Sequence, residues 1–580
     1  MKHVSIHRRK IPASDLPIFS EVPSALAKIY ASRGIQSKHE LGRHLKELLP
    51  DTAMKGMPEA VQRLSMAVKQ NQSILIVGDF DCDGATSTAV AMLGLKMMGA
   101  TQVDYLVPNR FEYGYGLSPE IVEVAYTQSP QLLITVDNGI SSVEGVARAN
   151  QLGMDVIVTD HHLAGGQLPD AVAIVNPNQP GCDFFAKSTC GVGVIFYVLI
   201  ALRRSLIADD WFAKQGMQQP NLASLLDLVA LGTVADVVAL EHNNRTLVYQ
   251  GLQRIRAGKA RPGLLALIEI SGRRKERLVA SDLGFALAPR LNAAGRLEDM
   301  SIGIECLLSD DEDYARELAQ TLDQLNLERR GIEQEMQQQA LSLLDQIQLD
   351  QTSLPFGLCL YDASWHQGVV GILASRIKEK THRPVIAFAP GDVGEIKGSA
   401  RSIPGLHIRD ALDQIATYHP GLITKFGGHA MAAGLTLAAD HFDLFCEAFD
   451  QVVRQQLSAE DLDQRLETDG SLLPEELSIS LAEHIREAGP WGHHFPEPLF
   501  DGDFRILQQR LVGKKHLKLV LMDPASGMHL DAIQFNTDLS SWPNEACKSV
   551  RVVYKLDVNE FRGQRTVQLL IEYIEPQNGY

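Results

Sequence analysis

The sequence has few cysteines, and none are spaced as metal ligands usually are. Its seven cysteines are scattered, and no two form a Cys-x-x-Cys pair. Zinc ribbons need such pairs, so this spacing argues against a zinc ribbon. Scattered cysteines also indicate reduced thiols, as in a cytoplasmic protein. We also find no apolar run long enough to cross a bilayer. The N-terminal stretch MKHVSIHRRKIPAS is basic but lacks the apolar core of a secretory signal.

Positive charge is also scarce, because the formal net charge is −17. This balance argues against a protein that coats nucleic acid without selectivity. It is compatible with a local basic channel, since salt screens each charge beyond roughly 10 Å. Internal repeats and low-complexity segments are absent from the sequence. A chain of 580 residues is too long for one core, so we expect three to five domains.

Short apolar runs alternate with helix-like segments in the first half of the chain. The runs occupy residues 73–77, 103–107, 132–136, 155–159 and 172–176. This rhythm is typical of a parallel α/β sheet with right-handed crossovers. In such sheets, ligands bind beyond the carboxyl ends of the strands.

The second half of the chain divides into three regions. A stretch of about 311–349, without proline, predicts one or two long helices that join two lobes; the alternative is a core helix of the first domain. A second α/β region follows, and then a series of strands that suggests a small antiparallel barrel, with an OB-type barrel as one option. The predicted domains are an N-terminal segment 1–45, a catalytic domain 46–310, a connecting helix 311–350, a smaller α/β domain 351–455 and a barrel 460–580.

Carboxylates and imidazoles follow several of the apolar runs. They are Asp79, Asp81 and Asp83 after the first run, Asp137 after the third, Asp160, His161 and His162 after the fourth, and Asp236 within a later apolar stretch. Alternation in an extended segment would send the first three to one side, with Gly84 turning the chain sharply into the next helix. Parallel strands would deliver at least the first three groups to one edge of the sheet.

Such a mixture of oxygen and nitrogen donors suits Mg²⁺ or Mn²⁺. The number of acids exceeds what one ion needs, so two ions are expected. A two-metal site indicates hydrolysis of a phosphoester or a phosphoanhydride. Each group alone has a simpler explanation, namely an Asp-rich turn, a solvated DHH turn or a paired core carboxylate. Only their order and their common placement favour a metal site.

The motifs DFDCDG, VDNG, TDHH and LGTVADVVAL, in this order, resemble those of the DHH phosphoesterase superfamily. The later KFGGHAMAAGLTL resembles the glycine-rich signature of the DHH-associated domain. The stretch PRLNAAGRL, the long insertion and the C-terminal strands make the chain similar to bacterial exonucleases specific for single-stranded DNA, from about residue 40 to the end. The resemblance implies a parallel-sheet DHH domain, a long connecting helix, a smaller α/β DHH-associated domain and an OB-like β-barrel.

The resemblance also implies a ligand set for two divalent ions, Mg²⁺ or Mn²⁺. Asp81 and Asp83 would serve one ion each, and Asp137 would bridge the two. His161 and Asp236 would complete the second site.

Three neighbouring residues receive supporting roles from the same resemblance. Asp79 is either a direct ligand or an acceptor behind the ligands. His162 would face the scissile phosphate, and Asp160 would orient a histidine. Many members of the superfamily carry a histidine just ahead of the acidic run, whereas this chain has Ile76-Val77-Gly78 there.

Arginines near glycine-rich turns are candidates for binding the substrate phosphates, because a guanidinium binds phosphate bidentately. The resemblance implies Arg110, Ser399 and Arg401 for a pocket that captures a 5′ phosphate, Arg290 and Arg296 for contacts to the strand near the metals, and His429 for the substrate site of the second lobe. The alternative for any one arginine is a surface ion pair.

Taken together, the resemblance implies a metal-dependent 5′→3′ exonuclease that degrades single-stranded DNA to mononucleotides in DNA repair and recombination, including mismatch repair. Single-strand-binding protein and a RecQ-type helicase are the partners it implies, and a monomer is expected. One alternative is a small-molecule phosphohydrolase of the superfamily, such as a pyrophosphatase or a dinucleotide phosphodiesterase. The other is a non-catalytic DNA-binding relative.

Overall fold

The computed structural model describes residues 4–11, 22–108, 116–350, 354–561 and 563–577. The chain folds as two compact units. The larger unit contains residues 8–295, 299–323 and 467–580, and the smaller one contains residues 1–7, 296–298 and 324–466. Each is described by itself.

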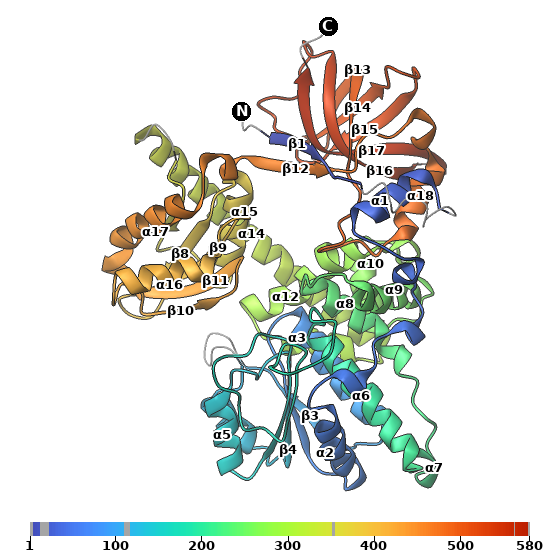
Figure 1. Cartoon of the computed structure of the whole chain (residues 1–580), viewed down its shortest axis with the longest axis vertical. Coiled ribbons are helices and arrows are strands. Elements are labelled where there is room, and N and C mark those ends of the chain that lie inside the picture. The colour runs from blue at the N-terminus through green and yellow to red at the C-terminus, as the bar shows by residue number, and fades with distance from the viewer. Residues whose placement is uncertain (1–3, 12–21, 109–115, 351–353, 562, 578–580) are drawn as a thin grey trace. The chain divides into compact units, whose positions relative to one another are not determined.

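The N-terminal half of the larger unit contains a five-stranded parallel sheet (Figure 1). Its strand order is β3-β2-β4-β5-β6. The strands are β2 (Ile74–Val77), β3 (Val103–Leu106), β4 (Leu132–Val136), β5 (Asp155–Thr159) and β6 (Ala173–Val175). The five predicted strands are therefore confirmed to within about one residue. β2 and β4 are buried along their whole length, which explains why they are continuous apolar runs.

Helices cover both faces of this sheet. Leu75, Val77 and Leu133 pack against α4 and α5, and the next residues along each strand face the opposite side. Helix α3 contacts β2, β3 and β4, and α6 contacts β4 and β5, while α2 packs on α6 and on the edge strand β6. The helices named here are α2 (Met57–Lys69), α3 (Cys82–Met97), α4 (Pro119–Tyr126), α5 (Val143–Gln151) and α6 (Gly191–Ala208).

Helix α6 is apolar enough, at a mean hydropathy of 1.8 over 18 residues, to pass a length and composition test for a membrane span. The expectation that no apolar run reaches this length is therefore wrong for α6. However, 67% of this stretch is buried inside the fold, where α6 packs against α2, α3 and α8. A buried core helix passes the same test, so the apolar character of α6 is explained by its place in the core.

A layer of shorter helices completes the region around the sheet. They are α1 (Ser24–Ser32), α7 (Trp211–Lys214), α8 (Leu226–Ala235), α9 (His242–Arg256), α10 (Pro262–Ile270), α11 (Ala280–Asp282), α12 (Ala288–Leu297) and α13 (Ser301–Leu308). Helix α8 packs against both α3 and α9. It therefore brings its C-terminal end, and with it Asp236, to the start of α3.

The larger unit also contains a closed five-stranded barrel, ordered β13-β14-β15-β17-β16. Neighbouring strands are antiparallel except β15 and β17, which run parallel. The strands are β13 (Phe500–Val512), β14 (His516–Met522), β15 (His529–Gln534), β16 (Ser549–Phe561) and β17 (Gln564–Gln577). This closure confirms the predicted barrel. The helix α18 (Ile479–Ala488) packs on β16 and β17.

The smaller unit is built on a mixed sheet of order β10-β11-β9-β8-β7. Only β7 and β8 are parallel. Its elements are β7 (Leu358–Tyr361), β8 (Val385–Pro390), β9 (Glu395–Arg401), β10 (Lys425–Gly428), β11 (Ala432–Ala438), α15 (Val370–Thr381), α16 (Ile408–Tyr418) and α17 (Phe442–Gln456). The predicted second α/β region is confirmed, but the strands β9, β10 and β11 could not be recognised individually, because glycine and alanine interrupt their apolar pattern.

The predicted connecting helix is one continuous helix, α14 (Glu312–Asp350), rather than two. Its Met336, Ala340 and Leu344 pack with β7, β8 and α15 in the core of the smaller unit. The strands β1 (Val4–Arg8) and β12 (Gln464–Thr468) pair to form a short two-stranded sheet.

The carboxylate of Asp501 anchors Arg8, the last residue of β1, to the barrel. It is 1% exposed and accepts hydrogen bonds from the guanidinium groups of Arg8 and Arg551 and from the Thr468 hydroxyl, at 2.7–2.9 Å for the shortest contact of each. Although burial opposes ionisation, these donors hold the pKa of Asp501 below its usual value. Three charged or polar groups therefore depend on one buried carboxylate.

We predict that Asp501→Ala lowers the free energy of unfolding by roughly 2–3 kcal/mol, because two arginines lose their buried partner. Because the pKa of Asp501 is depressed by folding, its stabilisation is present above pH 3.8 and is lost only as the pH falls through the depressed value. Urea unfolding at pH 7 and pH 3 measures both effects. Asp503→Ala, an exposed acid on the same strand, should change stability by less than about 0.5 kcal/mol, and an equal loss in both variants would contradict the assignment.

Candidate functional site

The three acids after β2 lie in a loop and in the first turn of α3. Asp81 is the N-cap residue of α3, and its Oδ1 accepts a hydrogen bond from the Gly84 N–H at 3.0 Å. Asp83 is already helical, so the expectation of one extended segment with all three side chains in register is wrong. Gly84 is helical as well and does not turn the chain. A Cβ there would lie 2.5 Å from the Asp79 carbonyl oxygen, so glycine permits the loop to press against α3.

The carboxylate of Asp83 is 1% exposed and lies against the N-terminus of α6. It accepts the backbone N–H of Gly191 at 2.7 Å and that of Val192 at 2.9 Å. Two unpaired N–H groups at a helix start favour a negative charge. Burial and the charge of Asp81 nevertheless raise the pKa of Asp83 to about 7.

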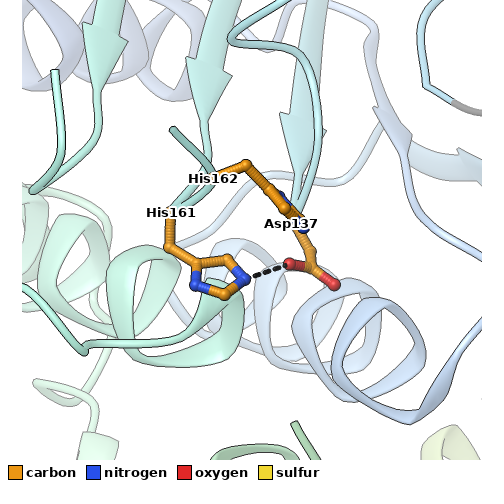
Figure 2. A group of neighbouring side chains, drawn as sticks. All are labelled: Asp137, His161 and His162. Carbon is orange, nitrogen blue, oxygen red and sulfur yellow. Dashed lines mark ion pairs between the residues drawn. The ribbon is translucent and has the colours of Figure 1, made fainter. Parts of the chain in front are cut away.

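Asp137 and the two histidines lie at the ends of β4 and β5 (Figure 2). The Nε2 of His161 is 3.1 Å from Asp137 Oδ1 and 3.4 Å from Asp236 Oδ2. Figure 2 shows the His161 ring pointing toward the Asp137 carboxylate. Asp137 has a positive φ of 61°, an uncommon conformation for a residue with a side chain. Such strain is retained where the surrounding structure fixes a functional group.

Asp160 supports the two histidines from behind. Its Oδ1 accepts the backbone N–H of His161 at 2.7 Å and contacts the Nδ1 of His162 at 2.7 Å, while Oδ2 accepts the N–H of Ile140. Burial lowers the pKa of His162, but the hydrogen bond and charge of Asp160 outweigh it and raise that pKa to about 9. Asp160 therefore fixes both the backbone of the DHH turn and one histidine ring.

The acids and His161 form three overlapping groups of potential ligands. Within each, one atom per residue lies within 4.8 Å of the others, and the groups are Asp79, Asp81 and Asp137; Asp83, His161 and Asp236; and Asp137, His161 and His162. Carboxylate oxygens with one or two imidazoles are the donors that Mg²⁺ and Mn²⁺ accept. The donor set therefore fits divalent cations, and Asp137 and His161 each belong to two groups.

The electrostatics of the cluster agree with this assignment. Burial and the charges of the neighbouring aspartates raise the pKa of Asp137 and of Asp236 well above the usual value. Carboxylates that repel one another in a buried place need nearby positive charge to stay ionised. A divalent cation supplies that charge.

Several asparagines that the sequence analysis did not single out hold the site loops together. The Asn292 Oδ1 accepts the N–H of Cys82, at the start of α3, at 2.7 Å. The Asn176 side chain donates to the His162 carbonyl at 2.9 Å, and Asn178 donates to the His161 carbonyl at 2.6 Å. Asn138 donates to the ends of β2 and β4. Most of these contacts join distant segments, and only Asn138, in the VDNG motif, and Asn292, in the PRLNAAGRL stretch, lie in motifs that the sequence shows.

The smaller unit gathers Ser399 and Arg401 on β9. The Arg401 guanidinium donates to the hydroxyls of Ser375 and Ser399 at 3.1 Å each and to the Ala400 carbonyl. It forms no ion pair with a carboxylate among the described residues, and burial lowers its pKa. A Cβ on Gly371, at the start of α15, would lie 2.9 Å from both Arg401 and Ser399. A partly buried guanidinium, two hydroxyls and a helix N-terminus together form a favourable environment for an anion.

The other candidate substrate residues have mixed surroundings. Arg290 is 8% exposed and pairs with Asp323 at 2.9 Å, so it braces α12 against α14. Arg296 donates to the Gly368 carbonyl at 3.0 Å. His429 lies between β10 and β11 in the smaller unit, where its backbone N–H donates to the Ala432 carbonyl. Arg110 lies outside the described residues.

We predict that Gly191→Ala weakens Mn²⁺ binding by roughly 10- to 100-fold, the range seen when groups that orient metal ligands are changed. The added Cβ would lie 2.5 Å from the Cβ and 2.7 Å from the Oδ1 of Asp137, so that carboxylate must move. Calorimetric titration with Mn²⁺ measures the affinity. Gly166→Ala, where a Cβ meets no atom within 4 Å, is the matched control; equal affinities in the two variants would disprove this role of Gly191.

Three family models match the chain. Residues 73–233 match the DHH family N-terminal domain, residues 355–455 match the DHHA1 domain, and residues 468–573 match the RecJ OB domain. The first of these contains six of the seven potential ligands, and only Asp236 lies beyond it.

Similar proteins cover nearly the whole chain. The single-stranded-DNA-specific exonuclease RecJ of Dickeya dadantii is 56% identical over 98% of this chain and 99% of its own, and that of Escherichia coli is 54% identical over 99% and 100%. A crystal structure of RecJ in complex with Mn²⁺ from Thermus thermophilus matches with a TM-score of 0.81 and 29% identity, over 99% of this chain and 80% of that one. On this similarity across its full length, the chain belongs to the RecJ family.

Proposed function

We propose that this protein is a metal-dependent exonuclease that degrades single-stranded DNA from the 5′ end and releases mononucleotides. The observation that carries this proposal is the cluster of carboxylates and His161 at the carboxyl edge of the sheet. It lies in a chain whose relatives, matched from end to end, are named single-stranded-DNA-specific exonucleases.

Two divalent cations, Mg²⁺ or Mn²⁺, fit the ligand geometry. Asp79, Asp81 and Asp137 would hold one ion, and Asp83, His161 and Asp236 the other. Asp137, which also lies within reach of His161, would bridge the two. When bound, such ions would activate a water for in-line attack on a phosphate and would neutralise negative charge on that phosphate.

His162 is proposed to face the scissile phosphate. Asp160 holds its ring through Nδ1 at 2.7 Å, so Nε2 lies on the opposite side of the ring. Burial lowers the pKa of His162, but the hydrogen bond and charge of Asp160 outweigh it and favour the positively charged ring. It is therefore suited to stabilise the negative charge that develops on the phosphate, or to position the leaving oxygen.

Arg401 and Ser399 are proposed to capture the 5′ phosphate of the strand. The guanidinium is held in place by Ser375 and Ser399 and has no carboxylate partner within the described part of the chain. Recognition of a terminal phosphate would restrict cleavage to strand ends, which distinguishes an exonuclease from an endonuclease. Arg110, Arg296 and His429 are further candidates for contacts with the strand, whereas Arg290 is proposed to act by positioning α12.

The barrel is proposed to bind the strand beyond the cleaved bond. Its β13–β14 turn carries Lys514 and Lys515, and the ring of His516 packs edge-on against Phe535 at 5.1 Å. Phe535 is 57% exposed. Cations beside exposed aromatic rings are typical of single-strand binding by OB-type barrels. Trp542, by contrast, is buried in the barrel, as expected for a core residue.

A small-molecule phosphohydrolase is the weaker alternative, because the similarity to RecJ extends through the barrel, and a polymer substrate explains that part of the chain.

We propose the domain limits 46–310, 311–350, 351–455 and 460–580 for the catalytic domain, connecting helix, DHH-associated domain and barrel. We propose a cytoplasmic location, with which the seven free thiols agree. A monomer and roles in repair and recombination are proposed on family resemblance alone. Single-strand-binding protein and a RecQ-type helicase are proposed as partners on family resemblance alone.

We predict that Asp81→Ala reduces cleavage of a 5′-phosphorylated single strand by at least about 100-fold, because one ligand of a metal is lost. Binding of the strand should stay within about threefold of the wild-type value, since the barrel and the phosphate pocket are unchanged. Release of mononucleotides with Mn²⁺ and fluorescence anisotropy give the two measurements. Asp104→Ala, an exposed acid on β3, is the control. Parallel losses of cleavage and of binding would mean that Asp81 has a structural role.

We predict that Arg401→Gln selectively slows the cleavage of strands that carry a 5′ phosphate. Because a charged hydrogen bond to phosphate is lost, the preference for phosphorylated over unphosphorylated ends should fall roughly tenfold. The ratio of kcat/KM for the two strands measures this preference. Arg409→Ala removes an exposed arginine from the same unit and should leave the ratio unchanged. An unaltered ratio in Arg401→Gln would exclude Arg401 from the end-recognition pocket.

A further inference from the structure

A cavity of about 780 Å³ lies within the larger unit, between the helices beyond the sheet and the barrel. One wall is the C-terminal end of α8 with the segment that follows it. The turn η7 (Leu283–Leu287) forms part of the same wall. The other wall consists of α18, the loop of residues 489–493 that follows it, and strand β16. Apolar atoms contribute most of the lining.

The cavity and the metal-ligand cluster share a segment of chain. Val234, Ala235 and Val237 line the cavity, and Asp236, which lies between them, reaches His161 at 3.4 Å. Val237 has a positive φ of 58°, which is a genuine outlier for a β-branched residue. Strained backbone of this kind clusters at functional sites. The turn directs Asp236 toward His161 and Val237 toward the cavity.

Phe285 is the unusual residue of the lining. It is 80% exposed, and Val237 is 64% exposed, although both are large and apolar. Phe285 lies on η7, which is a π-helical turn. Such turns are rare and recur at functional sites. A Cβ on the neighbouring Gly284 would lie 3.2 Å from Val234, so η7 packs closely on the end of α8.

The lining has four cationic and four acidic side chains, and three of the four cations form ion pairs, whereas Arg256 donates to the Leu278 carbonyl at 2.9 Å. Arg277 pairs with Glu560 at 2.7 Å, Arg486 with Asp557 at 2.9 Å, and Lys555 with Glu497 at 2.8 Å. A path for the phosphate backbone would need cations that are not already paired. An apolar, nearly neutral lining with an exposed ring instead matches the flat faces of nucleobases.

We propose that this cavity receives unpaired nucleobases of the strand just beyond the scissile phosphate, and that Phe285 is the residue on which one of them stacks. This inference rests on the proposed function. Only an unpaired base can leave its stack and enter, because a base in a duplex is held by its partner. The cavity would thus contribute to the selection of single strands beside the metal centre itself.

The experiment places 2-aminopurine at one position at a time in a 5′-phosphorylated 12-mer, bound in EDTA so that no cleavage occurs. Wild-type protein should quench the probe at one or two positions near the 5′ end. Phe285→Ala should abolish that quenching and weaken binding roughly tenfold, while Phe285→Tyr should restore both. Tyr418→Ala, which removes an exposed ring outside the cavity, should match the wild type.

A second arm removes the base instead of the ring. An abasic nucleotide at the quenched position should weaken wild-type binding about as much as Phe285→Ala does, and the two changes together should add little further. Fully additive losses, or quenching that persists in Phe285→Ala, would overturn the assignment. If the wild-type protein with Mn²⁺ failed to cleave the same strand, the proposed function would fail instead, which keeps the two conclusions separate.

Discussion

Several carboxylates held within a few ångströms of one another inside a protein repel strongly, and the larger unit is arranged around that repulsion. Part of it is compensated by the backbone. Asp83 accepts two N–H groups from the start of α6, and Asp81 caps α3. Asp137 and Asp236 instead face the His161 ring, and their pKa values are raised well above normal. Divalent cations are the remaining means of keeping these groups ionised together.

Bringing the acids so close constrains the backbone around them. Helix α3 approaches Asp79 so closely that residue 84 must be glycine. Helix α6 approaches Asp137, at the end of β4, so closely that residue 191 must be glycine. The chain must also turn sharply at Asp137 and Val237, and both have positive φ. Dense contacts and strained turns thus follow from the same requirement, that ligands from four separate elements converge on one place.

The sequence predicted what depends on periodicity and on residue order. The five parallel strands, the long helix and the barrel follow from apolar runs that local patterns reveal. The convergence of Asp137, His161 and the acid loop follows from strand-end placement in a parallel sheet. The register within the acid loop could not be predicted, because whether Asp83 continues a strand or begins a helix depends on its capture by the N-terminus of α6, over a hundred residues away. The role of Asn176 could not be predicted either, because its partner, the His162 carbonyl, lies in a separate loop.

The distribution of charge separates strand binding from cleavage. A chain of net charge −17 repels DNA at long range, and the ligand cluster repels phosphate until cations neutralise it. We propose that attraction to the strand comes from local features, such as the partly buried Arg401 without a carboxylate partner among the described residues, and the lysines of the β13–β14 turn. The lining of the cavity at Phe285 has as many cationic as acidic side chains, so it contributes no net charge. On these proposals, affinity would depend on stacking and on the strand end, whereas the rate would depend on the metal-ligand cluster, so each could be changed without the other.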